Sequence, residues 1–254
     1  MMVKRLFLLQ SVLMITGFCF AQKKTYSVQQ AWFSYNNQTR LSNKWGLWGD
    51  FQLRTQENFF DDFSIGITRV GVMYYLKENT KLTVGYAYAH YFPADSHPDI
   101  AQPEYRPWQQ VQWHNNYSRL RMVQRIRLEE RFRRKIKDND ELADGYNFNY
   151  RLRYNFSFNF AFNKNHFASK TISYVLNNEL MVNFGKEIVY NAFDQNRLFA
   201  GFHYHTNAHD YLQFGYMYLY QQLTSGNRYR YIHAGRLSYF HTPDLRKKEP
   251  QPKP

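Results

Sequence analysis

The sequence has very little cysteine: one residue among 254, at Cys19. Cys19 lies in an amino-terminal segment that we expect to be removed. The mature chain would then hold no disulfide, no thiolate nucleophile and no thiolate metal site. The GxSxG, HExxH, P-loop and EF-hand motifs are also absent. No common catalytic or nucleotide-binding signature therefore points to an activity.

Long hydrophobic runs are equally scarce. No segment after the amino terminus has 18 consecutive apolar residues, so we expect no transmembrane helix. The one apolar run, LFLLQSVLMITGFCF, follows Lys4 and Arg5 and leads to a small residue, Ala21, as in a secretory signal peptide. The sequence therefore predicts a cleaved signal peptide over 1–21 and export of the remaining chain.

Aromatic residues, in contrast, are abundant. The chain has 22 tyrosines and 22 phenylalanines, yet its mean hydropathy is −0.68. A soluble all-β core would be built mainly from valine, isoleucine and leucine. Aromatic residues mixed with asparagine, glutamine and arginine instead suit a wall between lipid and a polar lumen.

These residues alternate with a period of two. In YNFNYRLRYNFSFNFAF, residues 146–162, every even position is aromatic or leucine and the odd positions are Asn, Arg, Ser or Ala. Successive side chains of a strand point to opposite faces, so this strand has one apolar face and one polar face. It is also far longer than the ~5–6 residues usual in a globular sheet. Such a strand is typical of a membrane barrel.

The same alternation recurs in eleven segments, joined alternately by short turns and by long polar connections. We infer an all-β fold, an antiparallel meander closed into a transmembrane β-barrel over 22–241, followed by a disordered, charged and proline-rich tail over 242–254. Eleven strands would force the first and last into a parallel pair. We therefore expect ten to twelve strands, with twelve preferred and the missed strand within 186–195.

The polar faces of neighbouring segments are rich in arginine. Arginine on the lipid side of a barrel costs about 2–4 kcal/mol at the midplane, so we expect these side chains in the lumen. The predicted lumenal residues are Arg119, Arg121, Arg125, Arg127, Glu129, Arg131, Arg151, Arg153 and Glu179. The predicted lipid-facing residues of the opposite face are Phe148, Tyr150, Leu152, Tyr154, Phe156 and Phe158.

Two interpretations of the arginine face remain open. A ladder of hydrogen bonds from arginine to glutamate and tyrosine would fill a narrow lumen, whereas an aqueous path lined by arginine would favour anions. Barrels of 8 strands are filled by their own side chains and those of 16–18 leave a channel, so about ten to twelve favour the ladder. We expect a structural or passive-transport barrel in the bacterial outer membrane.

An outer-membrane lipid-modifying enzyme and a surface interaction protein are the alternatives. His203 and His205 share one strand face, about 7 Å apart, and would need a third ligand to hold a metal. No serine lies beside them in the sequence. We therefore expect no catalytic residue, no metal and no cofactor.

The formal net charge is +13, or +11 without Lys4 and Arg5. The basic residues alternate with apolar ones along strands and are not gathered on loops, which argues against nucleic-acid binding. The expected partners are outer-membrane lipids, including lipopolysaccharide with its phosphates, and the barrel-assembly machinery.

Several segments together resemble one family. They are the strand start Ala31-Trp32-Phe33, the hairpin turn over 40–47, the strand pair 70–76 and 82–88, the run RIRLEERF over 125–132, and Asn196-Arg197-Leu198. In these features the chain, over about 28–240, resembles the DUF2490 family of uncharacterised bacterial outer-membrane proteins. The resemblance implies a barrel in the outer membrane and assigns no activity and no catalytic residue.

Overall fold

The computed structural model describes residues 23–94, 99–162 and 168–246, and its regular elements are all β-strands. No helix within these ranges is long and apolar enough to cross a membrane. The signal peptide predicted over 1–21 and the part of the predicted tail over 247–254 lie outside the described residues.

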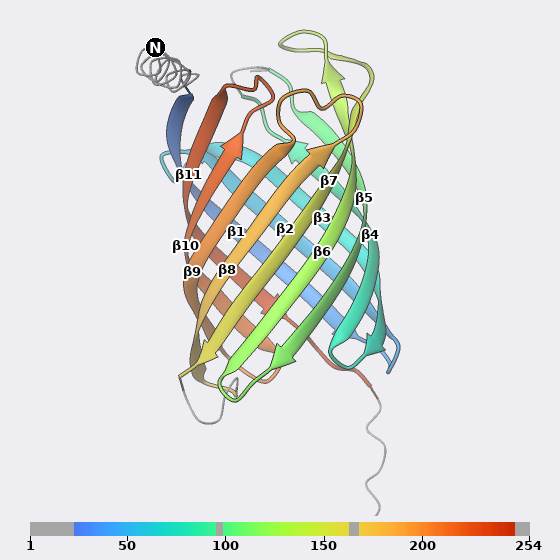
Figure 1. Ribbon diagram of the computed structural model, residues 1–254, viewed down its shortest axis with the longest axis vertical. Helices are drawn as coiled ribbons and strands as arrows, with labels where there is room; N and C mark the ends of the chain where they lie inside the picture. The colour runs from blue at the N-terminus through green and yellow to red at the C-terminus, as the bar shows by residue number, and fades with distance from the viewer. Residues whose placement is uncertain (1–22, 95–98, 163–167, 247–254) are drawn as a thin grey trace, which may run out of the picture.

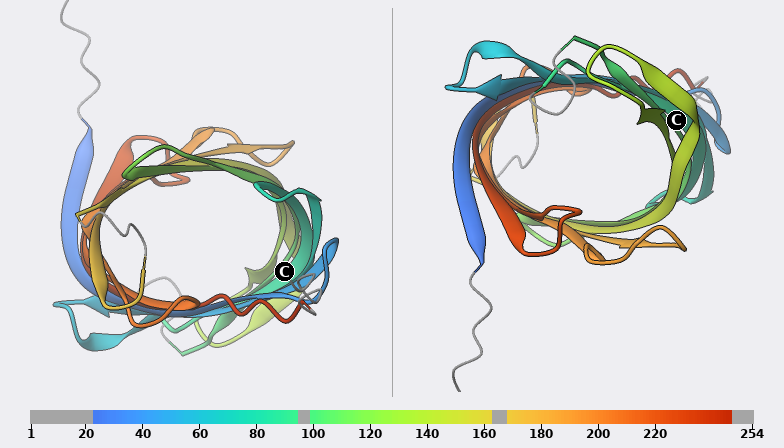
Figure 2. Two further views of the ribbon diagram at one scale, coloured as in Figure 1. Left: turned by 90° about the horizontal axis from the view of Figure 1, so that it is seen from below. Right: turned by 90° about the horizontal axis from the view of Figure 1, so that it is seen from above.

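Eleven strands form one closed barrel, and seen end-on they make a single ring of oval outline (Figures 1 and 2). In chain order the strands are β1 (Lys24–Arg40), β2 (Trp45–Glu57), β3 (Asp61–Lys77), β4 (Thr80–Tyr91), β5 (Gln102–Asn116), β6 (Leu120–Ile136), β7 (Leu142–Ala161), β8 (Thr171–Phe184), β9 (Phe193–His205), β10 (Asp210–Gln222) and β11 (Arg228–His241). The expectation of an all-β barrel is confirmed.

The barrel closes through β1 and β11, which run parallel from the Lys24–Arg228 pair to the Asn37–His241 pair. The other neighbouring strands are antiparallel. The preferred count of twelve strands is therefore wrong, and the segment 186–195 forms a loop and the start of β9. A parallel ladder pairs the edge groups of both strands, so closure needs no additional strand.

The two ends of the barrel differ in their connections. At the short-turn end, drawn at the bottom of Figure 1, the strands are joined by segments that include 41–44, 78–79, 117–119 and 206–209. At the opposite long-loop end the connections include 92–101, 137–141, 185–192 and 223–227. Residues 242–246 follow β11 at the short-turn end, where the Leu245 amide donates to the Arg40 carbonyl at 2.8 Å.

The polarity of the barrel is the reverse of that of a soluble domain, in which charged side chains are mostly exposed. Exposed apolar side chains occur on every strand except β5, and they include Phe33, Leu47, Val72, Val84, Ile126, Leu152, Leu180, Leu198, Phe214 and Leu237. Buried charged side chains include Asp50, Arg69, Glu104, Arg106, Arg127, Glu129, Arg151, Arg153 and Glu179. Because side chains alternate along a strand, the first set lies on the outer surface and the second in the interior.

Candidate functional site in the barrel interior

The interior has two parts. One is a set of buried arginines and carboxylates, here called the ion-pair network, which consists of Asp50, Arg69, Glu104, Arg106, Arg125, Arg127, Glu129, Arg131, Arg133, Arg151, Arg153, Glu179, Asp194 and Arg197. The other is a cavity of about 470 Å³ that lies toward the short-turn end, here called the basic cavity. Arg125, Arg153, Glu179 and Arg197 belong to both, since they line the inner end of the cavity.

Glu104 on β5 anchors the network near the long-loop end. Its carboxylate is fully buried and is bound by three arginines, with Arg131 Nε at 2.7 Å, Arg133 Nε at 2.6 Å, and Arg106 Nε as the third donor. Arg106 also donates to the Tyr91 hydroxyl at 2.9 Å. Each charge-assisted hydrogen bond is stronger than a neutral one, so a single acid fastens β5 to β6 from the inside.

Glu129 and Glu179 continue the network across β6, β7 and β8. Arg153 bridges the two acids, with Nη1 at 2.6 Å from Glu129 and Nη2 at 2.8 Å from Glu179. Arg151 donates to Glu129 at 2.5 Å and to Asp194 at 3.2 Å. These contacts join four strands through side chains alone, because Asp194 lies on β9.

A cluster of tryptophans fills the interior beside the network. Arg127 donates to the Gln110 side chain at 2.7 Å, and its guanidinium lies 4.2 Å from the centre of the Trp108 ring. Trp108 is fully buried and packs edge-on against Trp48. A methyl group added at Gly85 would come within 2.5 Å of the Trp108 ring, so the absence of a side chain at Gly85 makes room for it.

The register of the strands decides which arginine meets an acid. Arg125 pairs with Asn155 and Asn155 with Glu179, which sets Glu179 level with Arg125 two strands away, at an Nη2–Oε1 distance of 2.5 Å. Arg121, four residues earlier on the same face, pairs with Asn159 and then with the apolar Val175. The two arginines therefore have different surroundings, although both lie on the same face of β6.

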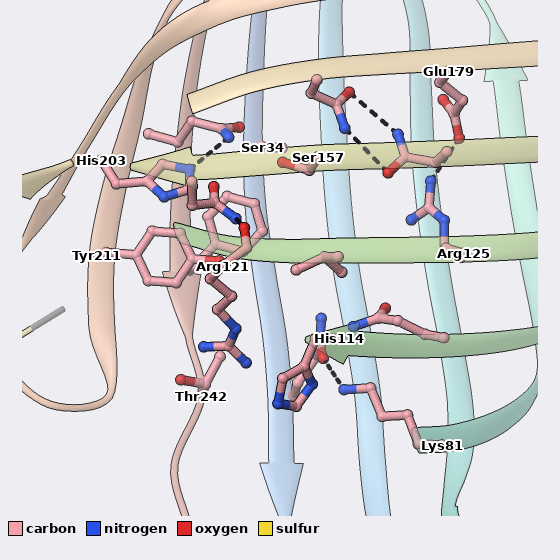
Figure 3. A pocket seen from close by; sticks show the side chains of 18 of the residues that line it. Ser34, Lys81, His114, Arg121, Arg125, Ser157, Glu179, His203, Tyr211 and Thr242 are labelled. Carbon is pink, nitrogen blue, oxygen red and sulfur yellow. Dashed lines mark hydrogen bonds and ion pairs between the residues drawn. The ribbon is translucent and has the colours of Figure 1, made fainter. Parts of the chain in front are cut away.

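The structure places the predicted lumenal residues as follows. Arg127, Glu129, Arg131, Arg151, Arg153 and Glu179 are buried in the network, and Arg121 and Arg125 line the basic cavity (Figure 3). Arg119 differs, because the turn 117–119 ends just before β6 and leaves its side chain exposed outside the strand. Alternation holds only within the strand, so the placement of Arg119 in the lumen stays a prediction.

The predicted lipid-facing residues of β7 lie on the outer surface of the barrel. Leu152 and Tyr154 are exposed, and the other four are half-buried. The half-buried rings pack on one another, with the Phe148 and Tyr150 centres 4.9 Å apart and the Phe156 and Phe158 centres 5.4 Å apart. Aromatic contacts along the strand account for this partial burial.

Three network acids, Asp50, Glu104 and Asp194, are absent from the predicted lumenal residues. Glu104 stands in PADSHPDIAQPEYR, where the prolines indicate a loop, but β5 begins at Gln102 and includes it. Alternation back from Arg106 would have placed Glu104 on the inner face. Asp194 lies at the start of β9, where the alternation is too short to identify a face.

The basic cavity opens at the short-turn end, where Glu78, Asn79 and Asp244 line it. Among the described residues, eight arginine and lysine side chains and three carboxylates line the cavity. The cations are Arg40, Arg54, Lys81, Arg121, Arg125, Arg153, Arg197 and Arg236, and the acids are Glu78, Glu179 and Asp244. With histidines neutral, the lining carries an excess of five positive charges.

Four of the cavity cations have no carboxylate within 4.0 Å among the residues that the structure describes. They are Arg54, Lys81, Arg121 and Arg236. Arg54 lies 3.7 Å from the centre of the Trp32 ring, and Lys81 donates to the Gln38 side chain at 2.5 Å. Arg236 donates to the Ser238 hydroxyl at 3.2 Å. The buried Nε atoms of Arg54 and Arg121 have no hydrogen-bond partner within the described ranges.

Histidines line the same cavity near its mouth. The Nε2 atom of His203 lies 2.8 Å from the Gln213 side-chain nitrogen, and the ring centres of His203 and His205 are 6.1 Å apart. In the described part of the chain, no group of three His, Cys, Asp or Glu side chains could hold a metal ion. The described residues therefore supply no third metal ligand for this pair.

The comparisons with known proteins give one result. The family model described as a protein of unknown function, DUF2490, matches residues 29–230. No curated protein and no solved structure matches the chain. The family match includes most of the barrel, from β1 to the start of β11. On this match, which extends over most of its length, the chain belongs to the DUF2490 family.

Proposed function

We propose that this protein is an integral outer-membrane β-barrel with a structural role, which spans the membrane as a closed wall and does not form an open pore. The observation that carries the proposal is the reversed polarity of the barrel, with apolar side chains exposed outside and ion-paired arginines buried inside. An exposed apolar surface of this extent would drive aggregation in water, whereas lipid would cover it.

The closed state is supported by the ion-pair network. Glu104, Glu129 and Glu179 each bind two or more arginine side chains, and Trp48 and Trp108 pack beside them. Charge-assisted hydrogen bonds hold these side chains in place, so a wide aqueous path between them would require several strong hydrogen bonds to break together. The part of the interior that holds the network is therefore filled by side chains, as in small outer-membrane barrels.

Passive transport of small anions is the second candidate function. It is favoured by the excess of five positive charges in the lining of the basic cavity. An anion that enters at the short-turn end would meet the network before it reached the long-loop end. Transport therefore requires a rearrangement of the network, and a structural role does not.

Single-channel recording in a planar bilayer tests the proposal. Wild-type protein is expected to insert without a conducting state, while Glu129→Gln is expected to produce anion-selective openings because it removes the acid that Arg151 and Arg153 share. Glu130→Gln is the matched control, since Glu130 neighbours Glu129 but lies outside the network. Steady conductance of the wild-type protein at low voltage would contradict the closed wall and support passive transport.

Cysteine labelling tests the membrane location independently. A mature chain without Cys19 has no thiol of its own. In whole membranes, a charged maleimide is expected to label Ser157→Cys, which lines the basic cavity, and to leave Leu152→Cys on the outer surface unlabelled. Equal labelling at both positions would contradict the proposal that lipid covers the outer surface.

A further inference from the structure

The basic cavity differs from the network in its charge balance. Glu179, the one acid at its inner end, is shared by Arg125 at 2.5 Å, Arg153 at 2.8 Å and Arg197 at 3.8 Å. The other two acids lie at the mouth, where Glu78 binds Arg40 at 2.6 Å and Asp244 binds Arg246 at 2.6 Å. All three carboxylates are therefore occupied by other cations.

The remaining cations of the cavity carry an energetic cost. Taking a guanidinium or ammonium group out of bulk water is unfavourable unless an opposite charge or enough hydrogen bonds replace the lost hydration. Arg54, Lys81, Arg121 and Arg236 have a few neutral partners and no acid within the described ranges. A bound anion would compensate all four without any change in the wall.

These four cations lie at two depths. Arg121 is the second residue of β6 and Lys81 the second of β4, so both are near the mouth. Arg236 lies five residues before the end of β11 and Arg54 nine residues after the start of β2, so both are deeper. From the rise and tilt of barrel strands, the two groups are separated by roughly 10 Å along the axis.

The wall between the two depths includes aromatic side chains. Trp32 lies between Arg54 at 3.7 Å and Arg197 at 5.2 Å, and Tyr211 lies near the mouth beside the histidines (Figure 3). The volume of about 470 Å³ is within the ~300–1,000 Å³ of small-molecule sites. We propose that the basic cavity binds a small organic anion that carries more than one phosphate or carboxylate group.

The ligand is a soluble molecule, not a membrane lipid. The strands pair all the way around the barrel, so an acyl chain has no lateral path through the wall. The mouth lies at the short-turn end, which faces the aqueous periplasm in outer-membrane barrels. The inference rests on the proposed function only for this orientation, and binding itself does not require the barrel to be closed to ions.

Isothermal titration calorimetry on the folded full-length mature chain in a zwitterionic detergent tests the proposal. Pyrophosphate and citrate are the probes, and trehalose is the neutral comparison. Both anions are expected to bind with one-site stoichiometry and trehalose to give no heat. Arg121→Gln and Arg236→Gln are each expected to weaken binding at least tenfold. The heat-modifiable gel shift shows whether each variant is folded. Where one of them does not fold, Lys81→Gln replaces it.

Arg119→Gln and Arg230→Gln are the matched controls, because they remove the same charge outside the lining of the cavity. They are expected to change the affinity by less than twofold. Absence of heat with both probes, or equal weakening by the controls, would overturn the site. Binding of dihexanoyl phosphatidic acid without binding of either soluble probe would overturn its assignment to a soluble ligand. Pyrophosphate binding by a barrel that conducts would contradict the proposed function alone.

Discussion

The two halves of the barrel interior use arginine in opposite ways. In the ion-pair network, Glu104 alone is bound by three guanidinium groups, and Arg153 joins two acids. In the basic cavity, Arg121 and Arg236 have no acid beside them within the described residues. Arg121 and Arg236 are half-buried and most side chains of the network are buried, and the two halves also differ in the carboxylates beside the arginines. Paired arginines cross-link the wall, and unpaired arginines leave positive charge available to a ligand.

The comparison is sharpest along β6, because Arg121 and Arg125 share a strand and a face. Arg125 is level with Glu179, whereas Arg121 is level with Val175. A displacement of four residues changes the partner from an acid to an aliphatic side chain. Substitutions in the two halves should therefore have unequal effects on stability.

The largest loss is expected for Glu104→Gln. The change leaves Arg106, Arg131 and Arg133 around a neutral amide, and breaking a buried ion pair from one side costs about 3–5 kcal/mol. The urea midpoint of the heat-modifiable folded form in detergent measures it. Glu130→Gln on the outer surface is the control and should leave the midpoint unchanged. A midpoint for Glu104→Gln that equals that of the control would show that the network does not stabilise the barrel.

Gly85→Ala should have an intermediate effect. The added methyl group would lie 2.3 Å from the Val70 carbonyl oxygen and 2.5 Å from the Trp108 ring, so backbone or tryptophan must shift. Overpacking of this kind costs about 1–3 kcal/mol. The control is Gly49→Ala, where nothing lies within 4 Å of the new methyl group. Equal urea midpoints for the two variants would contradict the close approach of Trp108 to β4.

Arg121→Gln should change stability little. An unpaired cation contributes no ion pair, and its removal also removes the cost of its desolvation, so the free energy of unfolding should stay within about 0.5 kcal/mol of wild type or rise. The same urea titration measures it. A loss of unfolding free energy as large as that of Glu104→Gln would show that Arg121 has a strong partner. It would contradict the proposed difference between the network and the basic cavity.

The smallest effect concerns Asp244, outside the strands at the mouth. Hydrogen bonds from Arg246 lower its pKa to about 2, below the ~3.9 of an unfolded chain. A lowered folded pKa contributes stability above the unfolded value, and this contribution is lost as the pH falls through about 2. Solvent screens this exposed pair, so Asp244→Asn should lower the urea midpoint only slightly at pH 6 and by less at pH 2. A difference between the two urea midpoints that grows toward low pH would contradict the lowered pKa of Asp244.

Much of the fold could be predicted because alternation along a strand is a local property. The period of two in 146–162 was sufficient to place Arg151 and Arg153 on the face opposite Leu152 and Tyr154, and the structure buries the first pair and exposes the second. Alternation also identified the eleven segments that became strands. It could not identify their ends, so Arg119 was assigned to a strand and Glu104 to a loop.

The partners of the charged side chains were decided by the tertiary structure alone. Glu104 meets Arg133, which is 29 residues away, because the register of β5 against β6 brings them level. The tertiary structure also decided how the barrel closes, since the first strand, β1, pairs in parallel with the last strand, β11. The sequence by itself determined which face of each strand is polar, because the pleat turns every second side chain to the same side. Only the closed barrel decided which arginines find an acid, because that depends on register and depth across several strands.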